Sequence, residues 1–160
     1  MKSAIAILLL LLSAQSNASE IIWDEEGVEA IDDRDEYLVE GTLHKLDNIP
    51  FIAINLYPFA DHSECKYSGV AADDSASTTF LFDGVAYDTH ILCIQYDDSS
   101  DYFYSLVTFD EDAQKHFIAR FATEVGLVEI EFESVWAQLP TLGFNDAYKE
   151  TFTKADSLNQ

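Results

Sequence analysis

The sequence predicts an α+β protein: a mostly antiparallel sheet of about five to six strands, with one or two helices packed on one face of the sheet. Three observations support this fold class. Apolar and polar residues alternate with a period of two in several segments separated by turn residues. The period changes to that of a helix only in the last third of the chain. Helices that follow a run of hairpin-connected strands are typical of α+β proteins.

The first two strands follow an acidic opening segment. Residues 37–46 have the pattern of a strand, and residues 51–57 form the second strand after a turn at residues 47–50. Pro58 ends this second strand, because proline cannot donate a hydrogen bond to a sheet. A polar stretch over residues 61–77 then predicts a long loop.

The strongest local pattern is a hairpin at Asp83-Gly84. Residues 78–82 and 85–96 are predicted to form the strands on either side of it. An Asp-Gly pair favours a type I′ turn, because both central residues of that turn need a positive φ. A further strand over residues 102–109 continues the antiparallel order.

The helical part of the chain begins near residue 110. Residues 110–123 carry apolar side chains three and four positions apart, and Asp110 is a suitable N-cap. Residues 128–132 then alternate as a half-buried strand with one wet face. A closing helix is predicted over residues 145–155, capped by Asn145.

Residues 1–18 have the pattern of a cleaved signal peptide. Lys2 supplies a positive charge, residues 4–12 form an apolar run, and Ser16 and Ala18 are the small residues of a cleavage site. The apolar run is too short to span a membrane, which takes about 20 residues. We therefore expect an exported protein, periplasmic in a Gram-negative cell and otherwise secreted, with no membrane partner after cleavage.

Residues 19–160 are predicted to form a single globular domain. A chain of this length can bury about two-thirds of the surface that it exposes when unfolded. Residues 19–36 form an acidic, partly ordered N-terminal segment, because isolated apolar residues interrupt the run of acids.

The two cysteines are predicted to form a disulfide between Cys65 and Cys93, since an exported protein folds where disulfides persist. On the chain-entropy model such a bridge contributes roughly 3.5 kcal/mol. The alternative is a zinc site, because His62 and His90 each lie three residues before a cysteine. Residues three apart on a strand point to opposite faces, so His90 and Cys93 could not reach one ion without a bulge.

The motifs of common active sites are missing from the sequence. There is no nucleophile elbow, P-loop, dinucleotide fingerprint or zinc-protease motif. The segment from Asp97 to Asp101 alternates oxygen ligands like a calcium loop but lacks the glycine and the distal glutamate, so we interpret it as a solvated turn. We accordingly predict no catalytic residue, cofactor or metal, and a protein that is not an enzyme.

The charge of the chain is strongly one-sided. The sequence has 30 acidic and 8 basic side chains, a net charge of −22, although its charged fraction of 24% is ordinary. Such a surface repels nucleic acid, whose phosphates are bound by lysine and arginine, and it repels anionic membranes. It attracts cationic proteins, which an acidic patch can steer into an encounter.

Three acidic groups could form the patch that meets such a partner, with aromatic side chains as anchors. They are the acidic segment at residues 20–40, the aspartates of the turn at residues 97–101, and the row of Glu129, Glu131 and Glu133 on one strand face. The anchors considered are Trp23, Tyr102, Tyr104 and Trp136. The predicted partner-binding residues are Trp23, Asp24, Glu25, Glu26, Asp32, Asp33, Asp97, Asp98, Asp101, Tyr102, Glu129, Glu131 and Glu133.

The sequence thus favours an exported acidic binding protein, for example a periplasmic inhibitor or an immunity protein that caps a cationic partner such as an envelope-targeting toxin. The alternative is a secreted or periplasmic ligand-binding or hydrolytic domain whose acidity is only an adaptation to a salty environment. A flat acidic face with exposed aromatic residues favours the first hypothesis. A pocket lined by converging His, Asp and Tyr side chains favours the second.

Overall fold

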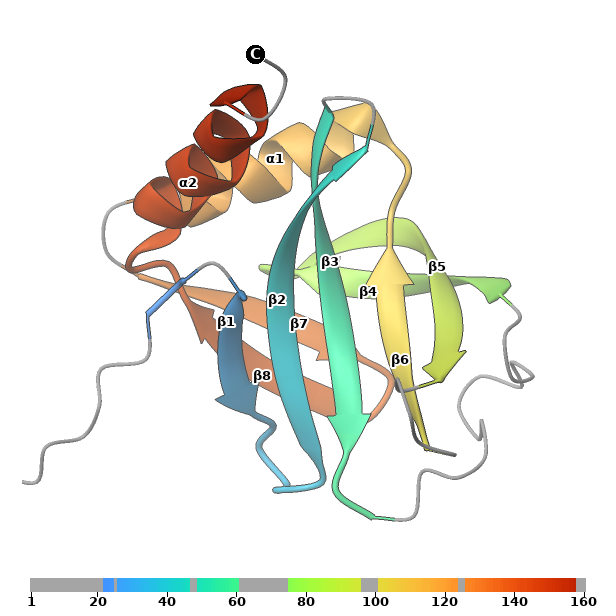
Figure 1. Cartoon of the computed structure of the whole chain (residues 1–160). Helices are drawn as coiled ribbons and strands as arrows, with labels where there is room; N and C mark the ends of the chain where they lie inside the picture. The colour runs from blue at the N-terminus through green and yellow to red at the C-terminus, as the bar shows by residue number, and fades with distance from the viewer. Residues whose placement is uncertain are drawn as a thin grey trace, which may run out of the picture.

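Eight strands and two helices make up the described part of the chain (Figure 1). The structure is a computed structural model that describes residues 22–24, 26–46, 49–60, 75–95, 101–123 and 126–157, with the side chains of residues 153–157 left out. The elements are β1 (Val28–Ile31), β2 (Tyr37–Leu46), β3 (Ile49–Pro58), β4 (Ser75–Phe82), β5 (Val85–Gln95), β6 (Tyr102–Val107), α1 (Glu111–Phe121), β7 (Leu127–Phe132), β8 (Val135–Pro140) and α2 (Phe144–Ser157).

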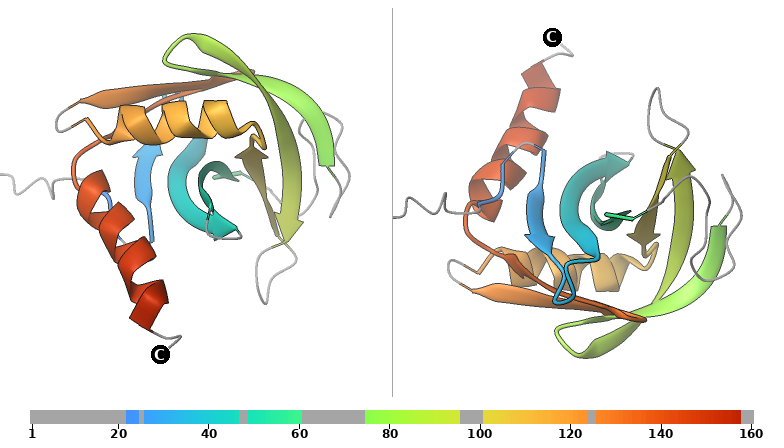
Figure 2. Two further views of the ribbon diagram at one scale, coloured as in Figure 1. Left: turned by 90° about the horizontal axis from the view of Figure 1, so that it is seen from above. Right: turned by 90° about the horizontal axis from the view of Figure 1, so that it is seen from below.

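The strands form one sheet that curls into a nearly closed barrel (Figures 1 and 2). Their order is β1-β2-β3-β6-β5-β4-β7-β8, and every recorded pair is antiparallel. The first and last strands of this order lie side by side, and the amide of Asp33, just after β1, donates a 3.0 Å hydrogen bond to the carbonyl of Trp136 in β8. The sheet therefore almost meets itself.

This architecture corrects the predicted fold class. A sheet of five to six strands with helices on one face is wrong, because β1 and β8 add two strands and the sheet closes. Helix α1 lies across one end of the barrel, and α2 lies beside it (Figure 2). Both missed strands had weak local patterns: β1 has four residues within an acidic segment, and the turn before β8 is Glu133-Ser134, which contains no glycine or asparagine.

The other strands lie where the sequence places them, to within a few residues at their ends. The hairpin between β4 and β5 is confirmed, with φ of 49° at Asp83 and 74° at Gly84. The N-cap of α1 is also confirmed, because the carboxylate of Asp110 accepts a 2.7 Å hydrogen bond from the amide of Ala113. The cap predicted for the second helix is wrong: α2 begins one residue earlier than expected, at Phe144.

The interior of the barrel is filled by side chains from every strand, as expected for a barrel of eight strands. Strand alternation sends every second residue inward, and these residues are almost all apolar. Phe117 of α1 closes one end by stacking on Phe82 at 4.3 Å between ring centroids. The inward residues with the lowest exposure include Val28, Val39, Ile52, Leu56, Phe82, Ile91, Leu106, Ile130, Phe132 and Leu139.

One buried amide holds α1 against β3. Strand β3 pairs with β6 only over residues 54–56, so the backbone around Ile52 needs other partners. Gln114 supplies them: its Oε1 accepts from the Ile52 amide at 2.8 Å, and its Nε2 donates to the Ile52 carbonyl at 3.1 Å. The same nitrogen donates to the carbonyl of Thr108 at 2.9 Å. The side-chain amide of Gln114 thus makes the backbone hydrogen bonds that a neighbouring strand would otherwise make with Ile52.

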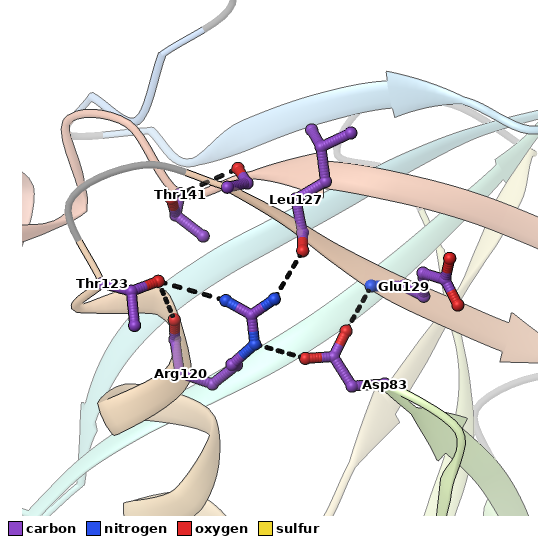
Figure 3. Close-up of polar contacts among 7 residues, drawn as sticks. Asp83, Arg120, Thr123, Leu127, Glu129 and Thr141 are labelled. Atoms are coloured by element: carbon purple, nitrogen blue, oxygen red, sulfur yellow. Dashed lines mark hydrogen bonds and ion pairs between the residues drawn. The ribbon is translucent and has the colours of Figure 1, made fainter.

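Arg120 joins the end of α1 to two strands (Figure 3). Its guanidinium pairs with the carboxylate of Asp83 and donates to the carbonyl of Leu127 at 2.7 Å. The other oxygen of Asp83 accepts from the amide of Glu129 at 2.8 Å. The partly buried pair therefore fixes the β4–β5 turn, the start of β7 and the helix at one point.

Arg120→Ala is expected to lower the free energy of unfolding by about 2 kcal/mol, because it leaves Asp83 and a backbone carbonyl without a charged donor. Urea denaturation followed by circular dichroism measures this change. Lys115→Ala is the control on the same helix, since the ion pair of Lys115 with Glu111 is exposed and should contribute little. Equal midpoints for the two variants would contradict the structural role of Arg120.

Several predicted features fall on residues that the structure does not describe. Residues 1–19, with the predicted signal peptide, lie outside the described residues, and so does Cys65. Cys93 is disulfide-bonded and lies on the inner face of β5 with 1% of its surface exposed. In the described part of the chain, neither helix has the length and apolar character to cross a membrane.

Candidate partner-binding face

The closing of the barrel builds an acidic surface from three strands. β1, β8 and β7 lie next to one another, and each sends alternate side chains outward. In the register of β7 and β8, Glu131 is opposite Trp136 and Glu129 is opposite Gln138. We call this surface the acidic face and define it as Glu29, Ile31, Asp33, Glu129, Glu131, Glu133, Trp136 and Gln138.

The centre of the acidic face is not charged. Trp136 is half-buried, and Ile31 of the neighbouring strand has 56% of its surface exposed. Gln138 donates a 3.2 Å hydrogen bond to the carboxylate of Glu129. The carboxylates thus surround an aromatic and aliphatic centre, the arrangement of a polar rim around an anchor that protein interfaces use.

Three glutamates of this face, Glu29, Glu129 and Glu131, lack an ion pair with any described residue. Arg34 lies at the edge of the face, where its guanidinium donates to the backbone carbonyl of Ser134 at 2.7 Å. Like charges on one sheet face destabilise the fold, so the face keeps a repulsion that a cationic partner would relieve.

Trp23 is in the core and not on the surface. It is 3% exposed, and its indole N–H donates to the carbonyl of Pro140 at 2.9 Å. Its ring packs edge-on against Phe121 and Phe144, at 5.0 Å between centroids in each case. Trp23 therefore anchors the N-terminal segment to the end of the barrel and cannot contact a partner of the folded protein.

Asp32 is buried as well, with 3% of its surface exposed. Its Oδ1 accepts hydrogen bonds from the amides of Glu36 and Tyr37, both at 2.7 Å, and holds the turn between β1 and β2. Asp33, the next residue, is exposed on the acidic face. Two adjacent aspartates thus have different roles, one structural and one available to a partner.

The remaining acids of the N-terminal segment have mixed positions. Asp24 and Glu26 are exposed, and the carboxylate of Asp24 accepts from the amides of Glu26 and Gly27 at 2.8 and 3.1 Å. Glu25 lies outside the described residues. Asp24 thus shapes the entry into β1.

The third predicted acidic group does not join the acidic face. Asp97 and Asp98 lie outside the described residues, whereas Asp101 and Tyr102 are half-buried at the start of β6. β6 is four places from β8 in the strand order, on the opposite side of the barrel. Tyr104, the other aromatic candidate on β6, is buried in the core.

Glu29, Ile31 and Gln138 belong to the face but are not among the predicted site residues. The pattern that could have indicated them is the alternation of Val28-Glu29-Ala30-Ile31 and of Val135 to Leu139, in which small or aliphatic residues take turns with larger outward ones.

A polar network occupies the outer surface of β2 and β3, next to the acidic face, since Glu40 is directly opposite Glu29 in the register of β1 and β2. Glu40 accepts hydrogen bonds from the Tyr57 hydroxyl at 2.6 Å and from the Asn55 amide at 2.9 Å. His44 shares a 2.8 Å hydrogen bond with the hydroxyl of Thr42. Burial lowers the pKa of His44 more than the charge of Glu40 raises it, although part of the residue stays exposed. These groups satisfy one another, which suits a structural network.

A cleft on the outer surface of β4 and β5 contains the three types of side chain found in many hydrolytic sites, a serine, a histidine and an aspartate. Ser77 is directly opposite His90, and Asp88 lies two residues from His90 on the same face. No hydrogen bond joins any two of these three side chains, so they are not arranged as a nucleophile, base and orienting acid.

The structure also bears on the proposed zinc ligands. His90 and Cys93 point to opposite faces of β5, as strand geometry predicts, and His62 and Cys65 lie outside the described residues. Within the described ranges, no group of three or more His, Cys, Asp or Glu side chains could hold a metal ion.

Comparison with protein-family models, with curated proteins and with solved structures found no match to this chain.

Proposed function

We propose that this chain is an exported acidic binding protein whose acidic face caps a cationic surface of another protein. A periplasmic inhibitor, or an immunity protein that guards against an envelope-targeting toxin, is the kind of protein that would work in this way. The observation that supports the proposal best is that β1, β8 and β7 lie side by side, so that outward carboxylates of the N-terminal segment and of β7 share one surface with Trp136.

Both parts of this face have a physical use in binding. The carboxylates lie close together on the outer surface of a rigid barrel, so they attract a basic surface and orient it before contact. Ile31 and Trp136 supply apolar area that is removed from water once the partner docks. The carboxylates then raise the rate of association and select a basic partner, and burial of the uncharged centre stabilises the complex.

Site-specific photo-cross-linking tests the proposal. The photoreactive residue p-benzoylphenylalanine replaces Ile31 on the acidic face in one variant and Ile94 on β5 in the control. Both isoleucines are exposed, and β5 lies on a different side of the barrel. Each variant is mixed with envelope extract and irradiated at low and at high salt. A basic protein is expected to cross-link from position 31 at low salt, and less of it at high salt.

The control position separates the two hypotheses drawn from the sequence. Equal cross-linking from positions 31 and 94, or none from position 31 at low salt, would favour the rival explanation that the acidity is an adaptation to a salty environment.

A further inference from the structure

The cleft on β4 and β5 has the dimensions of a ligand site. It is an open cleft of about 510 Å³ over the outer surface of the two strands. Ser77, Thr79, Asp88 and His90 form its floor, and Phe109 and Asp110 stand at the edge where β6 leads into α1. The hydroxyls, the imidazole and the two carboxylates converge on one cavity from different elements.

A second, apolar groove adjoins this cleft. It has a volume of about 250 Å³ and lies between the adjoining ends of β2 and β3 and the start of α1. Leu46, Ile49, Pro50 and Phe51 line it, and Thr108 and Phe109 border both the groove and the cleft. The two cavities therefore form one elongated site that is polar at one end and apolar at the other.

Neither carboxylate of the polar end has a basic partner in the described part of the chain. Asp88 is exposed, and Asp110 uses one oxygen to accept the hydrogen bond of Ala113 at the helix start. The polar end is therefore anionic, and it belongs to a strongly acidic protein that concentrates cations around itself.

The side chains of this site are poorly accommodated without a ligand. Phe109 has 68% of its surface exposed, and its ring lies 5.3 Å from that of His90, between centroids, above the cleft. Leu46 and Ile49 are also exposed, so three large apolar residues lie together in water.

We propose that this site binds an organic cation with an apolar tail. An ammonium group fits the polar end, where Asp88 and Asp110 compensate its charge and the face of Phe109 offers a cation–π contact. The tail then crosses Phe109 and covers Leu46 and Ile49 in the groove. This site is separate from the acidic face, so it does not depend on the proposed function.

A titration with 4-phenylbutylammonium, followed by ¹⁵N–¹H NMR, tests the proposal. The backbone resonances of β4, β5 and the segment around Phe109 are expected to shift as the compound is added and to reach a plateau when the site is saturated. Asp88→Asn should weaken binding by about tenfold, because it removes a charged partner of the ammonium group. Phe109→Ala should weaken it by about threefold to tenfold.

Two controls make the result decisive. Asp112→Asn removes the same charge from an exposed carboxylate of α1 that does not line the site, and it should weaken binding by less than about twofold. The neutral analogue 4-phenylbutanol should bind much more weakly than the ammonium compound. The proposal is overturned if the alcohol binds equally well, if Asp112→Asn acts as strongly as Asp88→Asn, or if the shifts gather on the acidic face. The dispersion of each variant's spectrum shows that it is folded.

Discussion

Trp23→Ala is expected to lower the free energy of unfolding by about 3–5 kcal/mol, the range for removing a large aromatic side chain from a packed core. Trp23 is 3% exposed, contacts Phe121 and Phe144, and donates a hydrogen bond to Pro140. Its loss leaves a cavity at the end of the barrel and an unpaired carbonyl. Since a typical domain is stable by only about 5–15 kcal/mol, this one change removes a large part of the stability.

Trp136→Ala is the matched control, because Trp136 is the other tryptophan of the chain and is half-buried on the acidic face. Its removal should cost about 1 kcal/mol, typical of a partly exposed site. Urea unfolding followed by far-ultraviolet circular dichroism compares the two variants without relying on tryptophan fluorescence. If Trp23→Ala is no less stable than Trp136→Ala, the packing of the N-terminal segment on the barrel is incorrect.

The same pair of tryptophans shows where the sequence could not predict the site. Both were candidate anchors on composition alone, because an aromatic residue next to acids is consistent with an interface as well as with a core. Trp23 is buried by residues far away in the chain, since Phe144 and Pro140 cover it, whereas Trp136 is opposite Glu131 in its own hairpin. Contacts over such sequence distances leave no local pattern.

Strands with strong local patterns were predicted close to their true bounds. β2 shows this, since the predicted and observed strand both run from Tyr37 to Leu46. The near-closure of the sheet was not predicted, because it depends on β1 and β8, whose contact joins the beginning of the chain to its end. β1 is short and surrounded by acids, so its alternation resembles that of a solvated segment.

The orientation of acidic side chains, too, could be predicted only where the sequence has a strong local pattern. The row of glutamates on β7 could be predicted to face water because strict alternation fixes the orientation of a strand. In the N-terminal segment no such period exists, and Asp32 and Asp33 look equivalent in the sequence. The turn before β2 separates them, because its backbone amides require the carboxylate of Asp32.

The double reversal Glu129→Lys and Glu131→Lys is expected to slow association with the partner captured at position 31 by about 10- to 10³-fold at low salt. Both side chains are exposed on the outer surface of β7, so the change should leave the barrel intact. It also replaces the repulsion between these two side chains and the remaining carboxylates of the face by attraction, and we therefore expect the folded state to be no less stable. Stopped-flow or surface-plasmon measurements over a range of salt concentrations give the association rate.

The control for this variant is Glu111→Lys with Asp112→Lys on α1, which changes the net charge by the same amount at exposed positions outside the acidic face. If recognition resides on the acidic face, the control should keep most of the association rate, and its salt dependence should stay close to that of the unmodified protein. If both double variants are slowed equally, only the total charge of the protein attracts the partner. The acidic face would then have no special role, because exposed carboxylates anywhere on the barrel would act in the same way.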